Sequence, residues 1–143
     1  MNLFRSLEIS ASGLTAERLR MDLISNNIAN ANTTRTPEGG PYQRSVPVFA
    51  EALEEAVAGN GLPLRRAAGV KVTAIRTDGR PPRLVYDPGH PDADEQGYVA
   101  YPDINPVHEM VNLISASRAY EANVTAFNSA KEMFRAALEL AKI

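Results

Sequence analysis

Residues 3–28 read LFRSLEISASGLTAERLRMDLISNNI and carry the most regular apolar pattern of the chain. In it Leu7, Leu14, Met21 and Ile28 stand seven residues apart, and the charged side chains lie off this line. A seven-residue repeat of apolar side chains is typical of a helix that packs lengthwise against another helix. At a rise of 1.5 Å per residue, the stretch predicts a helix roughly 40 Å long.

The C-terminal end of the chain has the same character. Residues 107–143 contain neither Gly nor Pro, and Ala recurs along them, which favours a helix. The apolar side chains at a spacing close to 3.5 residues include Met110, Leu113, Tyr120, Val124, Phe127 and Phe134. Asn105 followed by Pro106 fits a helix start, with Asn as N-cap and Pro at the first helical position. The apolar lines of the two predicted helices are called the seams below.

The middle of the chain differs from both ends. All ten Pro, and eight of the nine Gly, lie between residues 37 and 106. Short alternating segments predict strands near residues 42–49, 70–75, 83–86 and 98–101, with Pro47 confining the first to an edge position. Residues 50–58 fit either a short helix or a segment without regular structure. The middle therefore predicts a small antiparallel β unit joined by extended loops.

These elements together predict an α+β fold. The long N- and C-terminal helices are expected to pair antiparallel as a coiled-coil-like core domain, because the chain leaves one helix and returns to the other through a small β unit. We expect an N-terminal helix within residues 1–32, a loop and extended segment rich in Asn, Gly and Pro over 33–69, the β unit over 70–104, and the C-terminal helix within 105–143.

The predicted helices carry more apolar surface than the Gly- and Pro-rich middle can cover, and exposed apolar surface on that scale marks an assembly interface. Four Asn within seven residues follow the first helix, which is more than one helix cap needs. We expect the surplus amides to bond to adjoining chains. The candidate interface combines the seams with these residues: Leu7, Leu14, Met21, Asn26, Asn27, Ile28, Asn30, Asn32, Met110, Leu113, Tyr120, Val124, Phe127 and Phe134.

Composition excludes several classes of function. A formal net charge of −2 argues against electrostatic capture of nucleic acid or of an anionic membrane. The absence of Cys excludes thiol chemistry, disulfides and Cys-based zinc sites. No apolar run approaches the ~20 residues of a transmembrane helix, so direct membrane insertion is not expected. Residues 1–6 lack the basic-then-apolar layout of a cleaved signal peptide.

No catalytic constellation stands out. His90 and His108 lack the spacing of metal ligands, and the adjacent carboxylates Glu54 and Glu55 lie on a predicted surface. Neither a nucleophile-elbow motif nor a phosphate-binding glycine loop occurs. We therefore expect a protein that is not an enzyme and that holds no cofactor or metal.

One alternative is a small calcium- or ligand-binding module that uses the loop from Asp87 to Asp103. The residues at positions 1, 3, 5, 6, 8 and 12 of a calcium-loop template are Asp92, Asp94, Gln96, Gly97, Val99 and Asp103. Position 12 normally supplies a bidentate Glu, whereas this chain has the shorter Asp. The Pro-rich residues 87–91 also prevent the helix that should precede such a loop.

Several segments resemble a known family. SASGL at residues 10–14 and NNIANANT at 26–33 are similar to the N-terminal signature of bacterial flagellar axial proteins, the rod, hook and hook-associated group. TRTPEGGPY at 34–42, VYDPGHPDAD at 85–94 and EMVNLISASRAYEAN at 109–123 narrow the resemblance to the proximal-rod members. The resemblance covers nearly the whole chain.

This resemblance implies a structural, non-enzymatic protein. Members of the family pass through the flagellar type III export apparatus without signal cleavage and stack helically to build the drive shaft. The implied partners are copies of the chain itself, other flagellar rod proteins and the export apparatus. The implied location is the basal-body rod that spans the periplasm, and the implied mechanism is torque transmission through packed terminal helices.

Overall fold

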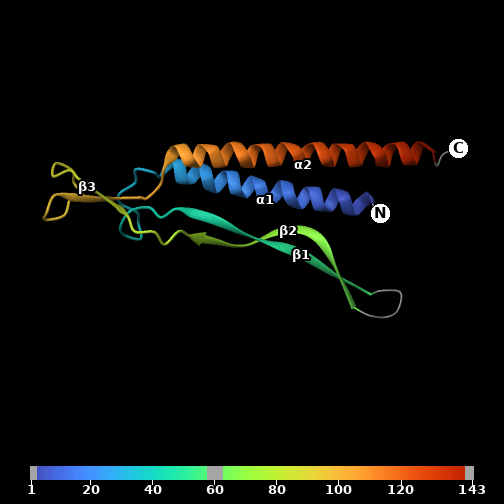
Figure 1. Cartoon of the computed structure of the whole chain (residues 1–143), viewed down its shortest axis with the longest axis horizontal. Helices are drawn as coiled ribbons and strands as arrows, with labels where there is room; N and C mark the ends of the chain where they lie inside the picture. Colours follow the sequence, from blue (N-terminus) through green and yellow to red (C-terminus); the bar gives the residue numbers. More distant parts are fainter. Residues whose placement is uncertain (1–2, 58–62, 141–143) are drawn as a thin grey trace.

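The computed structural model describes residues 3–57 and 63–140. Its elements in chain order are α1 (Leu3–Ala29), β1 (Ser45–Val57), β2 (Pro63–Thr77), β3 (Arg83–Tyr86), β4 (Tyr98–Tyr101) and α2 (Pro106–Leu140). Figure 1 shows α1 lying between α2 and the hairpin formed by β1 and β2, with β3 and the loops beyond the end where α1 stops and α2 starts. The predicted α+β class, with two long terminal helices and small antiparallel sheets, is confirmed.

The two helices run antiparallel, as expected. The rings of Phe4 and Phe134 lie 5.0 Å apart at one end of the pair, and Asn27 bonds to Glu109 at the other. Both helix termini nearest the chain ends therefore lie on the same side of the molecule (Figure 1). Between these contacts, a Cβ on Gly13 would stand 3.0 Å from the amide of Asn123. The single Gly of α1 thus marks a close approach of the two helices.

Helix α2 begins where the sequence predicts it. The Asn105 side-chain oxygen accepts a hydrogen bond from the Val107 backbone N–H at 2.9 Å, which satisfies a donor that the first turn leaves free. Pro106 is the first helical residue, where its missing N–H costs nothing. Helix α2 has 35 residues against 27 in α1, so α2 extends beyond its partner.

The β1–β2 hairpin is much longer than the sequence suggested. Its register runs from Ser45 opposite Thr77 to Val57 opposite Pro63, with irregularities after Val48 and Ala52. The short helix considered for residues 50–58 is therefore wrong over residues 50–57, and residue 58 lies outside the described residues. Pairing with β2 outweighs the helix preference of this Ala- and Glu-rich segment, since strand formation depends strongly on cross-strand contacts.

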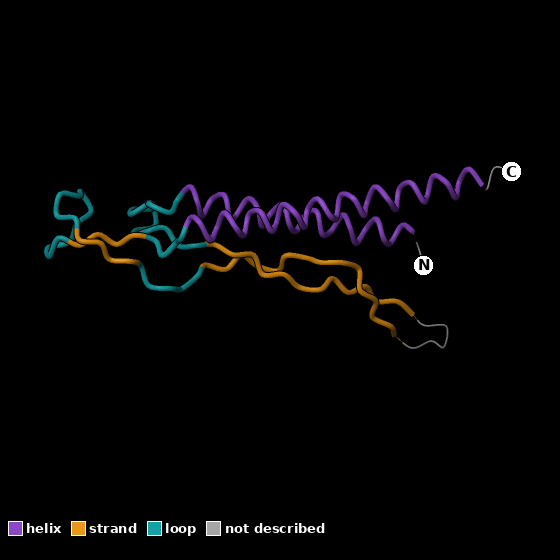
Figure 2. The backbone as a smooth tube through the Cα atoms, turned by 45° about the horizontal axis from the view of Figure 1, so that its top comes forward, coloured by secondary structure: helices purple, strands orange, loops and turns teal. Residues whose placement is uncertain are grey.

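A single β unit over residues 70–104 is not what forms. Strand β2 runs through residue 70 and pairs with β1, whereas β3 and β4 pair only with each other, from Arg83 opposite Tyr101 to Tyr86 opposite Tyr98. The strand prediction for residues 83–86 and 98–101 is correct. Figure 2 shows the long hairpin twisting beside the helices and the short one lying apart from it. Because every strand has one unpaired edge, Pro47 does occupy an edge strand, as expected.

The buried apolar core is small. Its members in the described residues are Ala16, Leu23, Ile24, Ala31, Val99, Ala116 and Ala130. Four of these are Ala, which allows the helix backbones to approach closely but removes little apolar area from water. None of the helices in the described part of the chain is long and apolar enough to cross a membrane.

Candidate assembly interface

Most seam residues of the two helices are partly buried within one chain. Leu7, Leu14, Met21 and Ile28 on α1 are half-buried. On α2 the half-buried seam residues are Leu113, Tyr120, Val124, Phe127 and Phe134. Each of these side chains is therefore covered in part and exposed in part within the single chain.

Met110 breaks this pattern. It was expected in the seam of α2, but 56% of it is exposed. The preceding residue, Glu109, faces inward instead and is only 2% exposed. A carboxylate is rarely buried unless it is paired and hydrogen-bonded, so the reason must lie in its partners.

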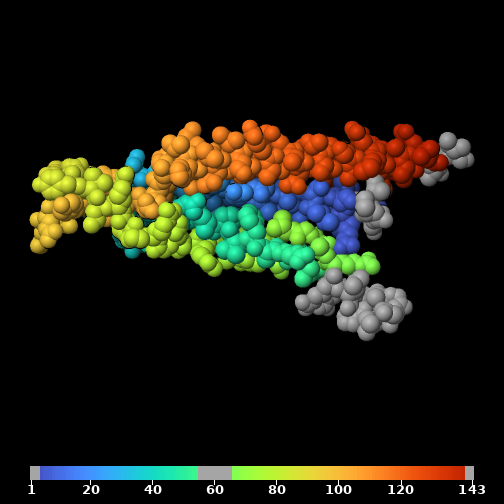
Figure 3. Space-filling view, viewed as in Figure 1, coloured from blue at the N-terminus to red at the C-terminus, as the bar shows by residue number. Residues whose placement is uncertain are grey.

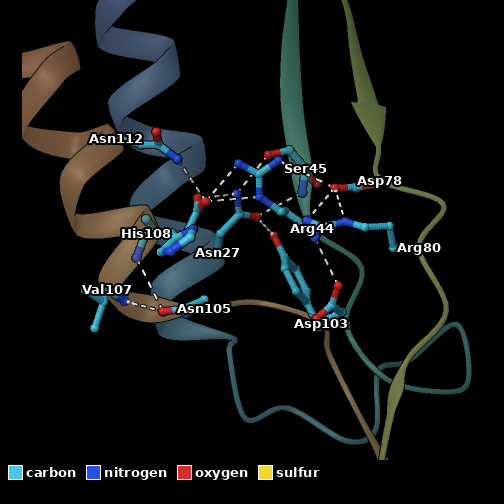
Figure 4. Close-up of polar contacts among 12 residues, drawn as sticks. Asn27, Arg44, Ser45, Asp78, Arg80, Asp103, Asn105, Val107, His108 and Asn112 are labelled. Carbon is cyan, nitrogen blue, oxygen red and sulfur yellow. Dashed lines mark hydrogen bonds and ion pairs between the residues drawn. The ribbon is translucent and has the colours of Figure 1, made fainter.

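These partners form a set that we call the junction cluster, shown in Figure 4. Its members are Asn27, Tyr42, Arg44, Ser45, Glu109 and Asn112. Arg44 donates to Glu109 Oε1 from Nε at 3.0 Å and from Nη2 at 2.8 Å, and Asn112 donates to the same oxygen at 3.2 Å. The charge of Glu109 is therefore compensated by a two-pronged contact with a guanidinium.

Asn27 is the centre of the cluster and is fully buried. Its amide nitrogen donates to the Ser45 carbonyl at 2.9 Å and to Glu109 Oε2 at 3.3 Å. Its oxygen accepts from the Ser45 backbone N–H at 2.9 Å and from the Tyr42 hydroxyl at 3.1 Å. All four hydrogen bonds that an Asn side chain commonly makes are used inside the chain, so Asn27 joins the end of α1 to the start of β1.

Arg44 also connects the cluster to the loop after β2. Its Nη1 lies 3.7 Å from Asp78 Oδ2, which in turn accepts from Arg80 Nε at 2.9 Å. The hydrogen bond from Arg80 lowers the pKa of Asp78, with further contributions from the charges of Arg80 and Arg44. The same pairing raises the pKa of Arg80. This carboxylate therefore stays ionised between two guanidinium groups.

The other three Asn of the junction are placed differently. Asn30 donates to the Asn26 carbonyl at 2.9 Å and accepts from the Thr33 hydroxyl at 3.1 Å, which ends α1. Asn26 and Asn32 are exposed. Of the four Asn, Asn27 is thus buried and joins α1 to β1, Asn30 makes local bonds at the helix end, and Asn26 and Asn32 are exposed.

The β1–β2 hairpin is also attached to the middle of α1. Ser12 Oγ accepts a hydrogen bond from the Val70 backbone N–H at 3.1 Å. Next to it, Gly69 has φ of +121°, and a Cβ there would stand 2.1 Å from Ser12 Oγ. Only Gly tolerates both this conformation and this approach. Arg5 donates to the Ala67 carbonyl further along, so the hairpin follows α1 for most of its length.

The outer side of α2 carries a second feature, which we call the α2 stripe. Val107, Met110, Val111 and Ile114 are each more than half exposed, at 65, 56, 61 and 55%. Their spacing places them on one side of the helix, opposite Glu109 and Ala116. In Figure 3, α2 runs along one edge of the molecule, and the hairpin lies on the far side of α1.

Two family models match the two ends of the chain. The one described as flagella basal body rod protein matches residues 7–35, which hold most of α1 and the Asn-rich turn. The one described as flagellar basal body rod FlgEFG protein C-terminal matches residues 95–140, which hold β4 and α2.

Whole-length relatives are named flagellar basal-body rod protein FlgC. The protein from Borreliella burgdorferi is 48% identical over 98% of both chains. The Bacillus subtilis protein is 44% identical over 99% of this chain and all of the relative, and the Escherichia coli O157:H7 protein is 39% identical over 98% of both. The chain belongs to the FlgC family of flagellar basal-body rod proteins. The resemblance drawn from residues 10–14, 26–42, 85–94 and 109–123 is confirmed.

The calcium alternative has no support in the arrangement of its carboxylates. Asp92 contacts Thr34 and Arg35, Asp94 accepts from the backbone of Gln96 and Tyr98, and Asp103 pairs with Arg80 at 3.0 Å. The carboxylates of Asp92, Asp94 and Asp103 therefore bond to different partners and do not surround a common point where an ion could bind. In the described residues, no group of three His, Cys, Asp or Glu side chains could hold a metal ion.

Sequence reasoning missed Arg44, Glu109, Ser12 and Gly69. The seam count assigned the inward position to Met110, and nothing local indicated that Arg44 would reach a residue 65 positions away. One signal was available for Glu109, which stands seven residues before the buried Ala116 and so shares its side of the helix. Gly69 stands just before the strand predicted for residues 70–75, so no local signal pointed to its place within a longer strand.

Proposed function

We propose that the chain is a structural subunit of the bacterial flagellar basal-body rod, which polymerises helically through its terminal helices and transmits torque. The observation that carries this proposal is the α2 stripe, a line of apolar side chains that the chain leaves uncovered although it folds its own helices together. Apolar surface of this kind marks an interaction site. Relatives similar over their whole length are named rod proteins.

The proposal extends to partners and location. We infer that copies of this chain and other rod proteins are its neighbours, that it reaches the basal body through the flagellar type III export apparatus without losing a signal segment, and that the rod containing it spans the periplasm. We propose a mechanical role and no catalysis. The polar groups of the junction cluster are hydrogen-bonded to one another and hold the helices and the hairpin together.

The interface is proposed to combine the outer parts of the seams, the α2 stripe and the exposed Asn26 and Asn32. Helices within residues 1–32 and 105–143 would form the core domain of the rod wall, and the segments over 33–69 and 70–104 would lie outside it. The buried Asn27 would act within the subunit by fixing the angle between the helices and the hairpin.

The test is complementation in a flagellated bacterium that lacks its own copy of this protein. We expect the wild-type chain to restore motility and complete rods in isolated basal bodies viewed by electron microscopy. Ile114→Asp should abolish both, because it places a charge in the stripe, whereas the exposed Ser115→Asp next to it should not. A chain that restores neither rods nor motility, although it is made and folded, would contradict the proposal.

A further inference from the structure

A groove lies between α1 and the β1–β2 hairpin, with a volume of about 550 Å³. Its apolar lining includes Ile9 and Ala16 of α1, Phe49 of β1 and Val70 of β2. Phe49 is 39% exposed and Ile9 is 41% exposed, so the chain's own packing covers each side chain only in part. At one border of the groove, the hydrogen bond from the Val70 backbone N–H to Ser12 Oγ attaches the hairpin to α1.

The groove carries negative charge. Two carboxylates, Glu17 and Glu51, line it, and in the described part of the chain no Lys or Arg does. In the part of the chain that the structure describes, Glu17 Oε2 is shielded from solvent and accepts no hydrogen bond, and its one charged partner is Arg20, which pairs with it at 3.5 Å. A shielded carboxylate oxygen without a donor is costly, so the groove favours a positively charged group.

A second groove on the other side of the Ser12 contact lacks this preference. It has a similar volume, about 590 Å³, and is lined by Val70, Val72 and Leu19. Its charged residues are Arg18, Lys71 and Asp22, which carry both signs. Charge therefore distinguishes the two grooves, although their size and apolar character are alike.

The chain itself presents the complementary surface. Val107, Val111, Ile114 and Arg118 recur at intervals of four, three and four residues, which forms one line along the outside of α2. Arg118 is exposed and makes no ion pair with any of the described residues. Among the described residues, the line that continues the α2 stripe therefore reaches a guanidinium without an ion-pair partner, and Glu121 follows it on the same side of the helix.

We propose that the acidic groove between α1 and the hairpin binds the α2 stripe of a second copy of this chain, with Arg118 of that copy between Glu17 and Glu51. The inference rests on the proposed assembly function and names the surfaces that meet. A groove of this volume admits a row of side chains but not a whole helix, which is about 10 Å across. The contact is therefore a ridge of α2 side chains entering a groove, as in ordinary helix packing.

The geometry of this contact favours an open polymer. The groove lies where α1 faces the hairpin, and the stripe lies on the side of α2 opposite Glu109 and Ala116, so a subunit that receives a stripe in its groove still offers its own stripe to the next subunit. Such a head-to-tail contact uses two different surfaces and propagates unless its rotation closes a ring.

Cysteine crosslinking tests the contact directly, because the chain has no Cys of its own. Purified Glu51→Cys and Arg118→Cys chains are mixed at high concentration under mild oxidation, so that any disulfide between them joins two copies. We expect a disulfide-linked dimer. The matched control pairs Glu51→Cys with Lys131→Cys, which is also exposed on α2 but lies about 140° around the helix from Arg118.

Charge reversal supplies a second, independent readout in cells. Glu51→Arg and Arg118→Glu should each reduce the number of complete rods by about tenfold or more, the size expected when a close charge pair across an interface is broken. The double variant should recover most of this loss. Lys131→Glu should leave rod number unchanged.

The outcomes separate this inference from the proposed function. If the wild-type chain builds rods but Glu51→Cys and Arg118→Cys crosslink no better than the Lys131→Cys control, the groove contact is overturned and the rod function stands. If the purified chains crosslink as expected but the wild-type chain builds no rods, the contact stands and the rod function fails. Charge reversals without mutual rescue would also overturn the groove contact.

Discussion

The inner and outer sides of the first turns of α2 contradict the usual rule of polarity. On the inner side the carboxylate of Glu109 is buried, whereas on the outer side Val107, Met110 and Val111 are mostly exposed. Residues 107–111 thus place a carboxylate on the inner side of the helix and apolar side chains on its outer side. The inner side is satisfied by Arg44 and Asn27 of the same chain, and the outer side has no partner within the described chain.

This comparison teaches that the two sides serve different purposes. The buried polar contacts are directional, so they determine how the hairpin and the helices meet at one defined angle. Contacts of the exposed apolar side are not directional. Covering this side with any surface of suitable shape removes apolar area from water and is therefore favourable. A subunit that must be rigid and must also bind its neighbours needs both the buried polar contacts and the exposed apolar side.

The largest expected effect is on the inner side. Arg44→Met removes the guanidinium and leaves the Glu109 carboxylate buried without a cation, which should lower the free energy of unfolding by about 3–5 kcal/mol. Urea denaturation of the purified chain measures this. Arg83→Met is the control, because Arg83 is exposed on β3. Equal stability of the two variants would show that the inner side does not hold the junction.

A smaller effect is expected at the second attachment of the hairpin. Gly69→Ala forces a Cβ toward Ser12 Oγ at a φ of +121°, which should cost about 1–3 kcal/mol of stability. Gly79→Ala is a matched control, since a Cβ at Gly79 meets nothing within 4 Å. Comparable unfolding midpoints for both would mean that the hairpin can leave α1 without loss, and that only the junction cluster holds it.

The outer side should behave in the opposite way. Ile114→Gln replaces an exposed apolar side chain, so the stability of the isolated chain should change by no more than about 0.5 kcal/mol. Rod formation in complemented cells should nevertheless decrease strongly, because the lost contact lies between chains. A variant that unfolds more easily but still assembles normally would reverse the assignment of the two sides.

The smallest effect concerns pH. The pKa of Asp78 is held below its ordinary value, about 3.8, chiefly by the hydrogen bond from Arg80. A depressed carboxylate pKa adds stability that is fully present above the ordinary value and is lost as the pH falls through the folded-state value. The free energy of unfolding of the wild-type chain should therefore exceed that of the Asp78→Asn variant by a small amount at pH 5, and this excess should disappear as the pH is lowered toward 3. A stability difference between the two chains that stays constant over this pH range would show that the ion pair of Asp78 with Arg80 does not cause it.

Much of the helical part could be predicted, because its information is local. The exclusion of Pro and Gly marked both helices, Asn105 and Pro106 marked the start of α2, and the seven-residue spacing indicated that the helices pair. The β region was predicted less well. The segments 83–86 and 98–101 alternate clearly and form β3 and β4, but the Ala- and Glu-rich residues 50–57 become strand only through pairing with β2.

The candidate site divides in the same way. Local patterns were enough to predict that two long apolar helices flank a turn-rich middle, that four Asn gather where the first helix ends, and that the chain resembles flagellar rod proteins. That Glu109, and not Met110, faces inward became visible in the folded chain alone. The physical reason is that spacing along a helix determines which residues share a side, whereas the choice of the buried side depends on distant groups such as Arg44 and Asn27 that can satisfy a charge there.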